Sequence, residues 1–241
     1  QTFLVIEHIP KTILLSGSDS EFHTLTYIIL SNPSNGTVTL DGATATYTSN
    51  SDTATGDIFT FKVNDGTIDS DPATVTINIT TVNDAPVSYS QTIDAIEQVG
   101  KSITLSATDP DNATLYYNIV DGPSYGSITL NSVTASPNGN TSPTLTYISN
   151  SETATSDSFT WKASDLSLES NTSTVTLNIT LVNDKPVAIA QTIEAIEQTA
   201  KTITLFGTDA EGNTLTYSIV SNPSNGTVTL DGATATYTSN S

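Results

Sequence analysis

The side chains best able to do chemistry in this sequence are acids that recur in register along the chain. They occupy three kinds of position: the end of an opening strand, an acidic turn, and the residue that follows an aromatic strand. These positions are held by Glu7, Glu97 and Glu197, by Asp19, Asp109 and Asp209, and by Asp65 and Asp165. Carboxylates that gather without a counter-ion repel one another, and Ca²⁺ relieves the repulsion because it takes about 6 to 8 oxygen ligands. The pattern therefore favours calcium binding over catalysis.

Two similar stretches, Val82–Pro86 and Val182–Pro186, each end one β-rich unit and begin the next. Proline fixes its own φ, lacks an N–H donor and pushes the preceding residue to extended geometry, so a strand can pass through but a helix cannot. Acids from both neighbouring units could converge at such a hinge on one cation. At the first hinge we expect Glu7 and Asp84 from the end of the first unit, and Asp109, Asp111 and Asp165 from the start of the second.

The elements that must position these acids follow from an internal repeat. The copies open with Gln-Thr at residues 1, 91 and 191, so the offsets are 90 and 100 residues. A ten-residue insertion in the second copy accounts for the difference, and Pro137–Asn140 within it is expected to form an extended hairpin tip. The predicted modules are residues 1–84, whose first strand segment is incomplete, 85–184 with the insertion, and 185–241, which lacks its last strands.

Within each copy, short stretches alternate apolar and polar residues, which predicts strands with one buried face. In the second copy these stretches are Ile103–Leu105, Leu115–Ile119, Ser127–Leu130, Leu145–Tyr147, Phe159–Trp161 and Val175–Ile179. The rhythm predicts an all-β chain of Greek-key β-sandwich modules arranged end to end. Trp161 corresponds to Phe61 of the first copy and occupies one of the alternating positions that face inward, so we expect it in the core.

A second, longer repeat in the sequence favours a structural array over an enzyme. Residues 31–51 and 221–241 are identical, whereas the middle copy differs. Near-identical modules in a row are typical of proteins built for length. Both histidines lie in the first copy only, so a repeated catalytic base is missing. A hydrolase is the least favoured class, because it would need an acid pair in a cleft.

The composition limits the partners. The formal net charge is −19, with 25 acids against 6 lysines and no arginine, which has the wrong sign for binding nucleic acid. The chain contains no cysteine, which excludes disulfides and thiolate metal sites. No apolar run approaches the roughly 20 residues needed to span a bilayer, so no membrane insertion is expected within this chain. An acidic, Thr-rich and Ser-rich surface favours an extracellular or cell-surface location.

Part of this pattern resembles a known family. Glu97, Thr108–Asp111, Ala163–Asp165 and Val182–Pro186 together are similar to the cadherin-like and bacterial Ig-like tandem repeats of large surface proteins and adhesins. The resemblance covers nearly the whole chain. It implies seven-stranded sandwiches, calcium at the junctions, and an extended stalk or adhesive array.

The resemblance also implies ligand sets for Ca²⁺. Those of the first junction are Glu7, Asn83, Asp84, Asp109, Asp111 and Asp165, and those of the second are Glu97, Asn183, Asp184, Asp209 and Glu211. The pattern departs from cadherins in two places. A further linker Asp is replaced by Thr81 or Leu181, and an acidic triplet is reduced to Asp52 or Glu152. Fewer ligands imply one or two ions per junction, where full cadherins hold three.

The sequence therefore predicts a non-enzymatic structural array, an extracellular stalk or filament segment stiffened by calcium. The alternative is an adhesin whose loops bind a glycan or a cell-surface protein. Expected partners are neighbouring modules or identical subunits in a polymer. The incomplete third copy leaves two alternatives open: a chain cut from a longer array, or a subunit completed by a strand from a neighbour.

Overall fold

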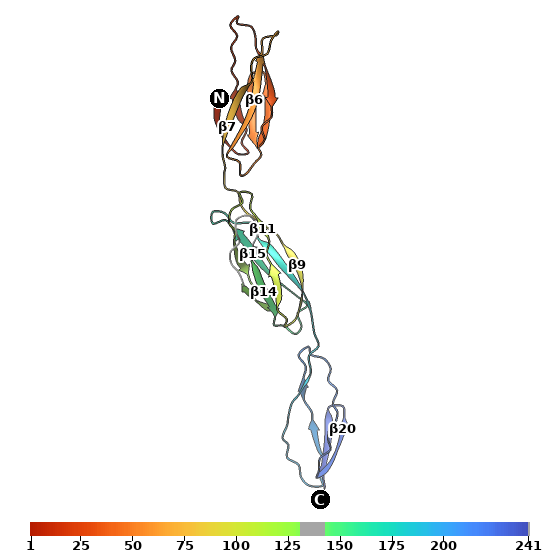
Figure 1. Ribbon diagram of the computed structural model, residues 1–241. Coiled ribbons are helices and arrows are strands. Elements are labelled where there is room, and N and C mark those ends of the chain that lie inside the picture. Colours follow the sequence, from red (N-terminus) through yellow and green to blue (C-terminus); the bar gives the residue numbers. More distant parts are fainter. Residues whose placement is uncertain (131–142, 241) are drawn as a thin grey trace.

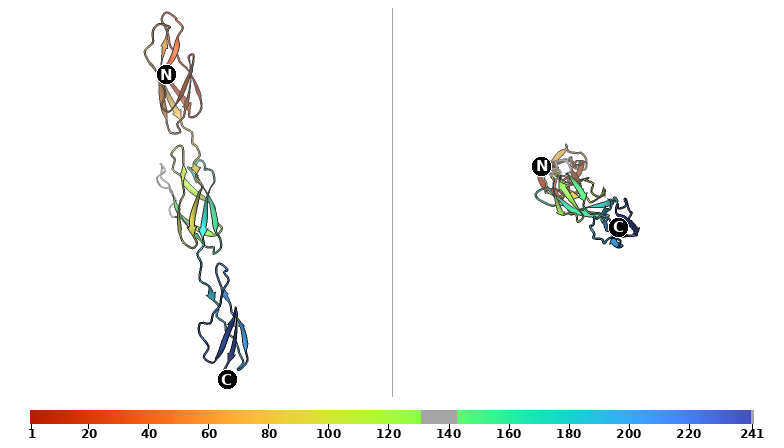
Figure 2. Two further views of the ribbon diagram at one scale, coloured as in Figure 1. Left: turned by 90° about the vertical axis from the view of Figure 1, so that its right-hand side faces the viewer. Right: turned by 90° about the horizontal axis from the view of Figure 1, so that it is seen from below.

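The computed structural model describes residues 1–130 and 143–240. Three units lie end to end and are joined by single extended segments (Figure 1), and the side view in Figure 2 shows the same order along one line. None of the described residues lies in a helix, which confirms the predicted all-β class. Module 1, module 2 and module 3 are used here for residues 1–84, 85–184 and 185–241.

Module 1 is a two-sheet sandwich. Its strands are β1 (Thr2–Ile6), β2 (Lys11–Leu14), β3 (Thr26–Ser31), β4 (Gly36–Asp41), β5 (Thr44–Ser49), β6 (Gly56–Asn64) and β7 (Ala73–Thr80). One sheet has the order β1-β7-β6-β3 and the other β2-β5-β4. β1 runs parallel to β7, whereas the other pairs are antiparallel. The period-two pattern buries one face of each sheet, with Phe59 and Tyr47 fully enclosed.

Module 2 repeats this architecture with a short additional pair. Its strands are β8 (Val87–Ser88), β9 (Gln91–Ile96), β10 (Lys101–Thr104), β11 (Ala107–Thr108), β12 (Tyr116–Asp121), β13 (Gly126–Leu130), β14 (Thr144–Ser149), β15 (Ser156–Ser164) and β16 (Ser173–Thr180). The sheets are β12-β15-β16-β9 and β10-β14-β13, and β8 pairs with β11. The predicted hairpin tip Pro137–Asn140 lies outside the described residues.

The cores follow the predicted inward parity. Trp161 is fully buried on β15, and Tyr117 stacks on it with ring centroids 5.5 Å apart. Tyr147 is also fully buried, and its hydroxyl donates a hydrogen bond of 2.9 Å to the buried Asp157. Asp157 additionally accepts the backbone N–H groups of Ser124 and Tyr125, so one carboxylate ties a turn to the core. The prediction that Trp161 packs in the core is confirmed.

Module 3 contains the three-stranded sheet that corresponds to β10-β14-β13 of module 2. Its strands are β17 (Val187–Ala188), β18 (Lys201–Thr204), β19 (Gly207–Thr208), β20 (Gly226–Asp231) and β21 (Thr234–Ser239), with the sheet order β18-β21-β20. Residues 191–196 and 216–219, which correspond to β9 and much of β12, are not in strands. In module 2, β9 and β12 are paired only through β16 and β15, and residues 185–241 contain no counterpart of those two strands. Ile193 and Ile219 are 39% and 38% exposed.

No helix among the described residues is long and apolar enough to cross a membrane.

Candidate metal sites at the module junctions

The start of each linker is held by a buried glutamate from the opening strand of the preceding module. Glu7 follows β1 and is 4% exposed, and its Oε1 accepts the backbone N–H of Val82 at 2.6 Å. Glu97 follows β9, is 3% exposed, and accepts the backbone N–H of Val182 in the same way. The Oε2 atom of each glutamate is buried and has no hydrogen-bond partner. A buried carboxylate oxygen without a partner is costly, so each position needs a further donor or a cation.

At the second junction, three glutamates meet across the boundary between modules. Glu97, Glu152 and Glu211 each place a carboxylate oxygen within 4.8 Å of the others. Module 2 supplies the first two and module 3 the third. In every one, Oε2 is buried without a hydrogen-bond partner.

The remaining oxygens of this glutamate cluster are fixed by the surrounding chain. Glu152 Oε1 accepts a hydrogen bond of 2.6 Å from the Gln98 side chain, and Glu211 Oε1 accepts the backbone N–H of Asp184 at 2.9 Å. Each of the three carboxylates is thus anchored through one oxygen and presents the other. This arrangement preorganises oxygen ligands before any ion arrives.

The electrostatics of the glutamate cluster fit a divalent cation. The four ion pairs among the described residues involve Asp19, Asp52, Asp69 and Glu169, and none includes a member of this cluster. Three carboxylates held together without a positive partner repel one another. Their ligand atoms are all oxygens, which suit hard cations such as Ca²⁺ better than soft ones. The residues present therefore fit the Ca²⁺ that the resemblance to cadherin-like repeats implies.

The first junction is also crossed by hydrogen bonds. The backbone N–H of Asp84 donates to Asp111 Oδ2 at 2.7 Å, and Asn83 Nδ2 donates to Asp165 Oδ2 at 2.7 Å. The backbone N–H of Leu168 lowers the pKa of Asp165, and the Asn83 side chain lowers it further. Linker residues of module 1 thus contact both acidic loops at the near end of module 2.

A separate group at the first junction lies against the base of module 1. Glu7, His8 and Asp84 bring a carboxylate oxygen, a ring nitrogen and a second carboxylate oxygen within 4.8 Å of one another. His8 Nε2 is 2.7 Å from Asp52 Oδ1. This group therefore contains a nitrogen donor, which the glutamate cluster lacks.

Asp109 shows how the acidic turn is built. Its Oδ1 accepts the backbone N–H groups of Asp111 and Ala113, both at 3.0 Å, so the side chain caps its own turn. Its Oδ2 is buried and has no partner. Asp109 thus combines a turn-forming role with one oxygen that remains available.

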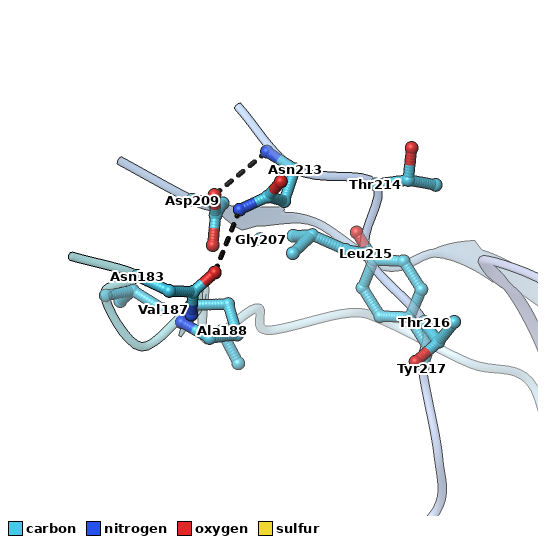
Figure 3. A pocket seen from close by; sticks show the side chains of 11 residues that line it. Asn183, Val187, Ala188, Gly207, Asp209, Asn213, Thr214, Leu215, Thr216 and Tyr217 are labelled. Atoms are coloured by element: carbon cyan, nitrogen blue, oxygen red, sulfur yellow. Dashed lines mark hydrogen bonds between the residues drawn. The ribbon is translucent and has the colours of Figure 1, made fainter. Parts of the chain in front are cut away.

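The corresponding turn of module 3 contacts its linker through asparagines. Asn213 donates its backbone N–H to Asp209 Oδ1 at 2.9 Å and its side-chain amide to Asn183 Oδ1 at 3.2 Å. Figure 3 shows these groups at one end of a pocket whose other end is formed by Leu215 and Tyr217.

A third acidic group lies at the far end of module 1. Asp19, His23 and Asp65 place one ligand atom each within 4.8 Å, and Asp19 and Asp65 correspond to Asp109 and Asp165 of module 2. The backbone N–H of Ile68 and both donors of Thr67 lower the pKa of Asp65 to about 2. The equivalent ends of modules 1 and 2 therefore carry aspartates at the same two loop positions.

The structure distributes the predicted ligands over these groups. It brings Glu97 and Glu211 together, joins Glu7 to Asp84, and links Asn83, Asp84 and Asn183 to loops of the next module by hydrogen bonds. Sequence reasoning missed His8, His23 and Glu152 as members of these groups, and Asp52 as the hydrogen-bond partner of His8. Asp52 and Glu152 occupy the same position in their copies, within Ser-acid-Thr-Ala-Thr, and that recurrence was the available signal.

Seven-stranded sandwiches with a parallel edge pair, repeated in tandem with acidic junctions, define an Ig-like and cadherin-like repeat protein. The sequence profile of the bacterial Ig domain family matches residues 1–78, 83–178 and 183–241. The chain therefore belongs to the bacterial Ig domain family. Domains of this kind are typically extracellular and non-enzymatic, and they serve in structural or adhesive modules.

Solved structures support the same fold. The EC22-24 fragment of mouse cadherin-23 is similar with a TM-score of 0.55 and 21% identity, over 99% of this chain and 84% of that one. Extracellular cadherin domains 1–5 of protocadherin gamma B2 give a TM-score of 0.53 and 16% identity, over 99% of this chain and 51% of that one. At these identities the likeness concerns the fold alone.

Other matched structures are longer than the chain. It spans 28% of an endo-fucoidan hydrolase of glycoside hydrolase family 107 and 51% of the human desmocollin-1 ectodomain. Their TM-scores of 0.34 and 0.47 are too low to bear on function. No curated protein sequence matches the chain significantly.

Proposed function

We propose that the chain is a segment of a non-enzymatic extracellular stalk or filament, in which Ca²⁺ at the module junctions fixes the angle between successive sandwiches. The proposed modules end at Asp84 and Asp184. The observation that carries this proposal is the glutamate cluster of Glu97, Glu152 and Glu211, because it combines a buried, unpartnered oxygen from each side of a module boundary.

The mechanical argument follows from where these ligands originate. Glu97 and Glu152 belong to module 2, whereas Glu211 lies on module 3. Oxygens fixed in two rigid sandwiches can share one cation only at a narrow range of relative orientations. Calcium bound there would convert a single-stranded hinge into a stiff joint, because opening the joint would break the coordination between Ca²⁺ and the carboxylate oxygens of one module.

At the first junction, the proposed ligands are Glu7, Asp84 and Asp109. Glu7 and Asp109 each have a buried oxygen without a partner. Asp111 and Asp165 act through hydrogen bonds to the linker and could add oxygens to the shell. The adhesin alternative shares this architecture and differs only in requiring a ligand-binding surface on a module flank.

The decisive experiment is a calcium titration of the complete chain after dialysis against a chelator. A ligand that binds only the folded state stabilises by about 2.7 kcal/mol when its free concentration is 100 times Kd. The melting temperature should therefore rise by several degrees when calcium is added. Small-angle scattering should also show a narrower distribution of module orientations.

A matched pair of variants locates the effect. Glu211→Gln removes a cluster carboxylate, and Asp231→Asn removes an exposed acid at the β20–β21 turn of the same module. The first should lose much of the calcium response and the second should keep it. Identical melts and scattering with calcium and with chelator would refute the proposal.

A further inference from the structure

His8 holds the same backbone position as a glutamine in the other two copies. Its φ is 57°, and the corresponding Gln98 and Gln198 have φ values of 58° and 54°. The three residues therefore share the same left-handed backbone conformation. Gln98 donates from Nε2 to Glu152 Oε1 at 2.6 Å, and His8 Nε2 contacts Asp52 Oδ1 at 2.7 Å. The histidine thus takes over the hydrogen bond that the glutamine makes in module 2.

The substitution adds one chemical property that glutamine lacks. A neutral imidazole that donates from Nε2 carries a lone pair on Nδ1, whereas a carboxamide nitrogen has no basic lone pair. Metal-binding histidines commonly use this arrangement, in which a carboxylate accepts the N–H and orients the ring for the metal. Asp52 is placed to be that carboxylate for His8.

The surroundings of His8 provide two oxygen ligands. A carboxylate oxygen of Glu7 and one of Asp84 lie within 4.8 Å of a His8 ring nitrogen and of each other. Glu7 is 4% exposed, and its Oε2 is buried with no hydrogen-bond partner. A buried anionic oxygen beside a basic nitrogen and a second carboxylate needs a cation that accepts both donor types.

We propose that the first junction binds a borderline divalent transition ion, of which Zn²⁺ is the representative, through Glu7, His8 and Asp84. Asp52 acts as the positioning residue for the imidazole. Histidine nitrogen and aspartate or glutamate oxygen are both zinc ligands in proteins, and water would complete the coordination. The oxygen-only glutamate cluster at the second junction lacks a nitrogen donor, so zinc should bind preferentially at the first junction.

This inference shares Glu7 and Asp84 with the calcium proposal but does not depend on it. Zn²⁺ could bind at the first junction even if neither junction held calcium. Equally, calcium could bind at both junctions without any contribution from His8, because glutamine occupies its position in module 2.

The test is isothermal titration of the complete, chelator-dialysed chain with zinc chloride, compared with the variant His8→Gln. This variant copies the natural residue of the second copy, and Gln98 shows that glutamine keeps the hydrogen bond to the neighbouring acid. We expect His8→Gln to weaken zinc binding at this site about tenfold or more, in line with the loss of a metal-orienting or metal-binding group. Asp41→Asn, at an exposed turn of module 1, should leave zinc binding unchanged and serves as the control, because His23 itself lies in the Asp19–His23–Asp65 group.

A second measurement reads His8 directly in the unmutated chain. Proton–nitrogen correlation spectra of the imidazoles should show a zinc-dependent shift of His8 Nδ1 while Nε2 stays protonated. The reciprocal change Gln98→His, beside Glu97 and Glu152, should create a second zinc site. Equal zinc affinity in the original chain and in His8→Gln, or an unchanged Nδ1 signal at saturation, would overturn the proposal.

Calcium titrations of the same proteins separate the two ideas. If His8→Gln loses zinc binding and retains the calcium response, both proposals stand. If calcium has no effect on either protein but zinc binds through His8, the calcium proposal fails alone.

Discussion

The backbone N–H of Asp84 donates a hydrogen bond to Asp111 Oδ2 across the first junction, at 2.7 Å. The second junction repeats the contact between Asp184 and Glu211 Oε1 at 2.9 Å. An aspartate and a glutamate thus reach the same linker atom, even though their side chains differ by one methylene. Each linker is therefore hydrogen-bonded to the next module without the help of an ion.

Removing this acceptor should loosen the joint without unfolding the modules. In Asp111→Ala, the N–H of Asp84 loses its partner, which costs about 1 kcal/mol of junction stability. Nitrogen relaxation in the presence of chelator should then report more independent tumbling of modules 1 and 2. Asp41→Ala, at an exposed turn at the other end of module 1, is the control. Unchanged tumbling in Asp111→Ala would show that the hydrogen bond does not restrain the hinge.

The glutamate cluster predicts opposite effects of one substitution in two buffers. Glu152→Gln removes a negative charge from beside Glu97 and Glu211, so in chelator the melting temperature of module 2 should rise. With calcium the same change removes a ligand, and the calcium-induced rise should fall by about half or more. Differential scanning calorimetry in both buffers measures the two effects. A loss of stability in chelator would mean that the hydrogen bond from Gln98 to the Glu152 carboxylate outweighs the repulsion among the three glutamates.

The tyrosine on the central strand of the three-stranded sheet should contribute most to stability in module 2, where its hydroxyl donates to the buried carboxylate of Asp157. Tyr147→Phe removes a buried hydrogen bond to Asp157 and should destabilise module 2 by about 1 to 3 kcal/mol. Tyr237→Phe is the matched control, because Tyr237 donates instead to the backbone oxygen of Asn225 at 3.2 Å in an exposed setting. Chemical denaturation compares the two losses, and equal losses would contradict the proposed role of Asp157.

The close approach of Gly126 to Tyr147 makes a second packing prediction. A Cβ atom at Gly126 would lie 2.4 Å from the tyrosine ring and 2.6 Å from the Ile148 carbonyl oxygen. Gly126→Ala should therefore cost about 1 to 3 kcal/mol or more through overpacking. Gly122→Ala, where nothing lies within 4 Å of the new atom, should be nearly neutral. Denaturation midpoints of the two variants check this, and a neutral Gly126→Ala would show that the strands can separate without cost.

Asp65 predicts part of the acid response of module 1. Its pKa is lowered from 3.8 to about 2 by the hydrogen bonds from Ile68 and Thr67. Because the folded pKa is below the unfolded value, this contribution is fully present above about pH 4 and is lost as the pH falls towards 2. Carbon-detected titration of the Asp65 carboxyl should give the lowered value directly. Asp65→Asn should reduce the pH dependence of stability in that window, and an ordinary carboxyl titration near pH 4 would contradict the geometry.

The sequence by itself determined the repeat, the all-β class and the inward parity. Period-two alternation decides which face of a strand is buried, and for that reason Trp161 and Tyr147 were predictable core residues. The tandem copies and the proline-containing linkers likewise predicted where the junctions lie. The acids of the turns, such as Asp109, were identifiable because they recur at equivalent positions.

Only the tertiary structure decided which acids share a site. Glu152 lies 55 residues from Glu97 and 59 from Glu211 in the chain, and nothing local links it to either. Their meeting depends on how the loop before β15 folds against the end of β9, and on how module 3 docks below it. The same is true of His8: Asp52, in the loop between β5 and β6, and Asp84, in the linker after β7, lie beside it only in the folded chain, and the zinc proposal depends on that arrangement. Long-range packing sets such distances, whereas sequence periodicity reports only which face each side chain occupies.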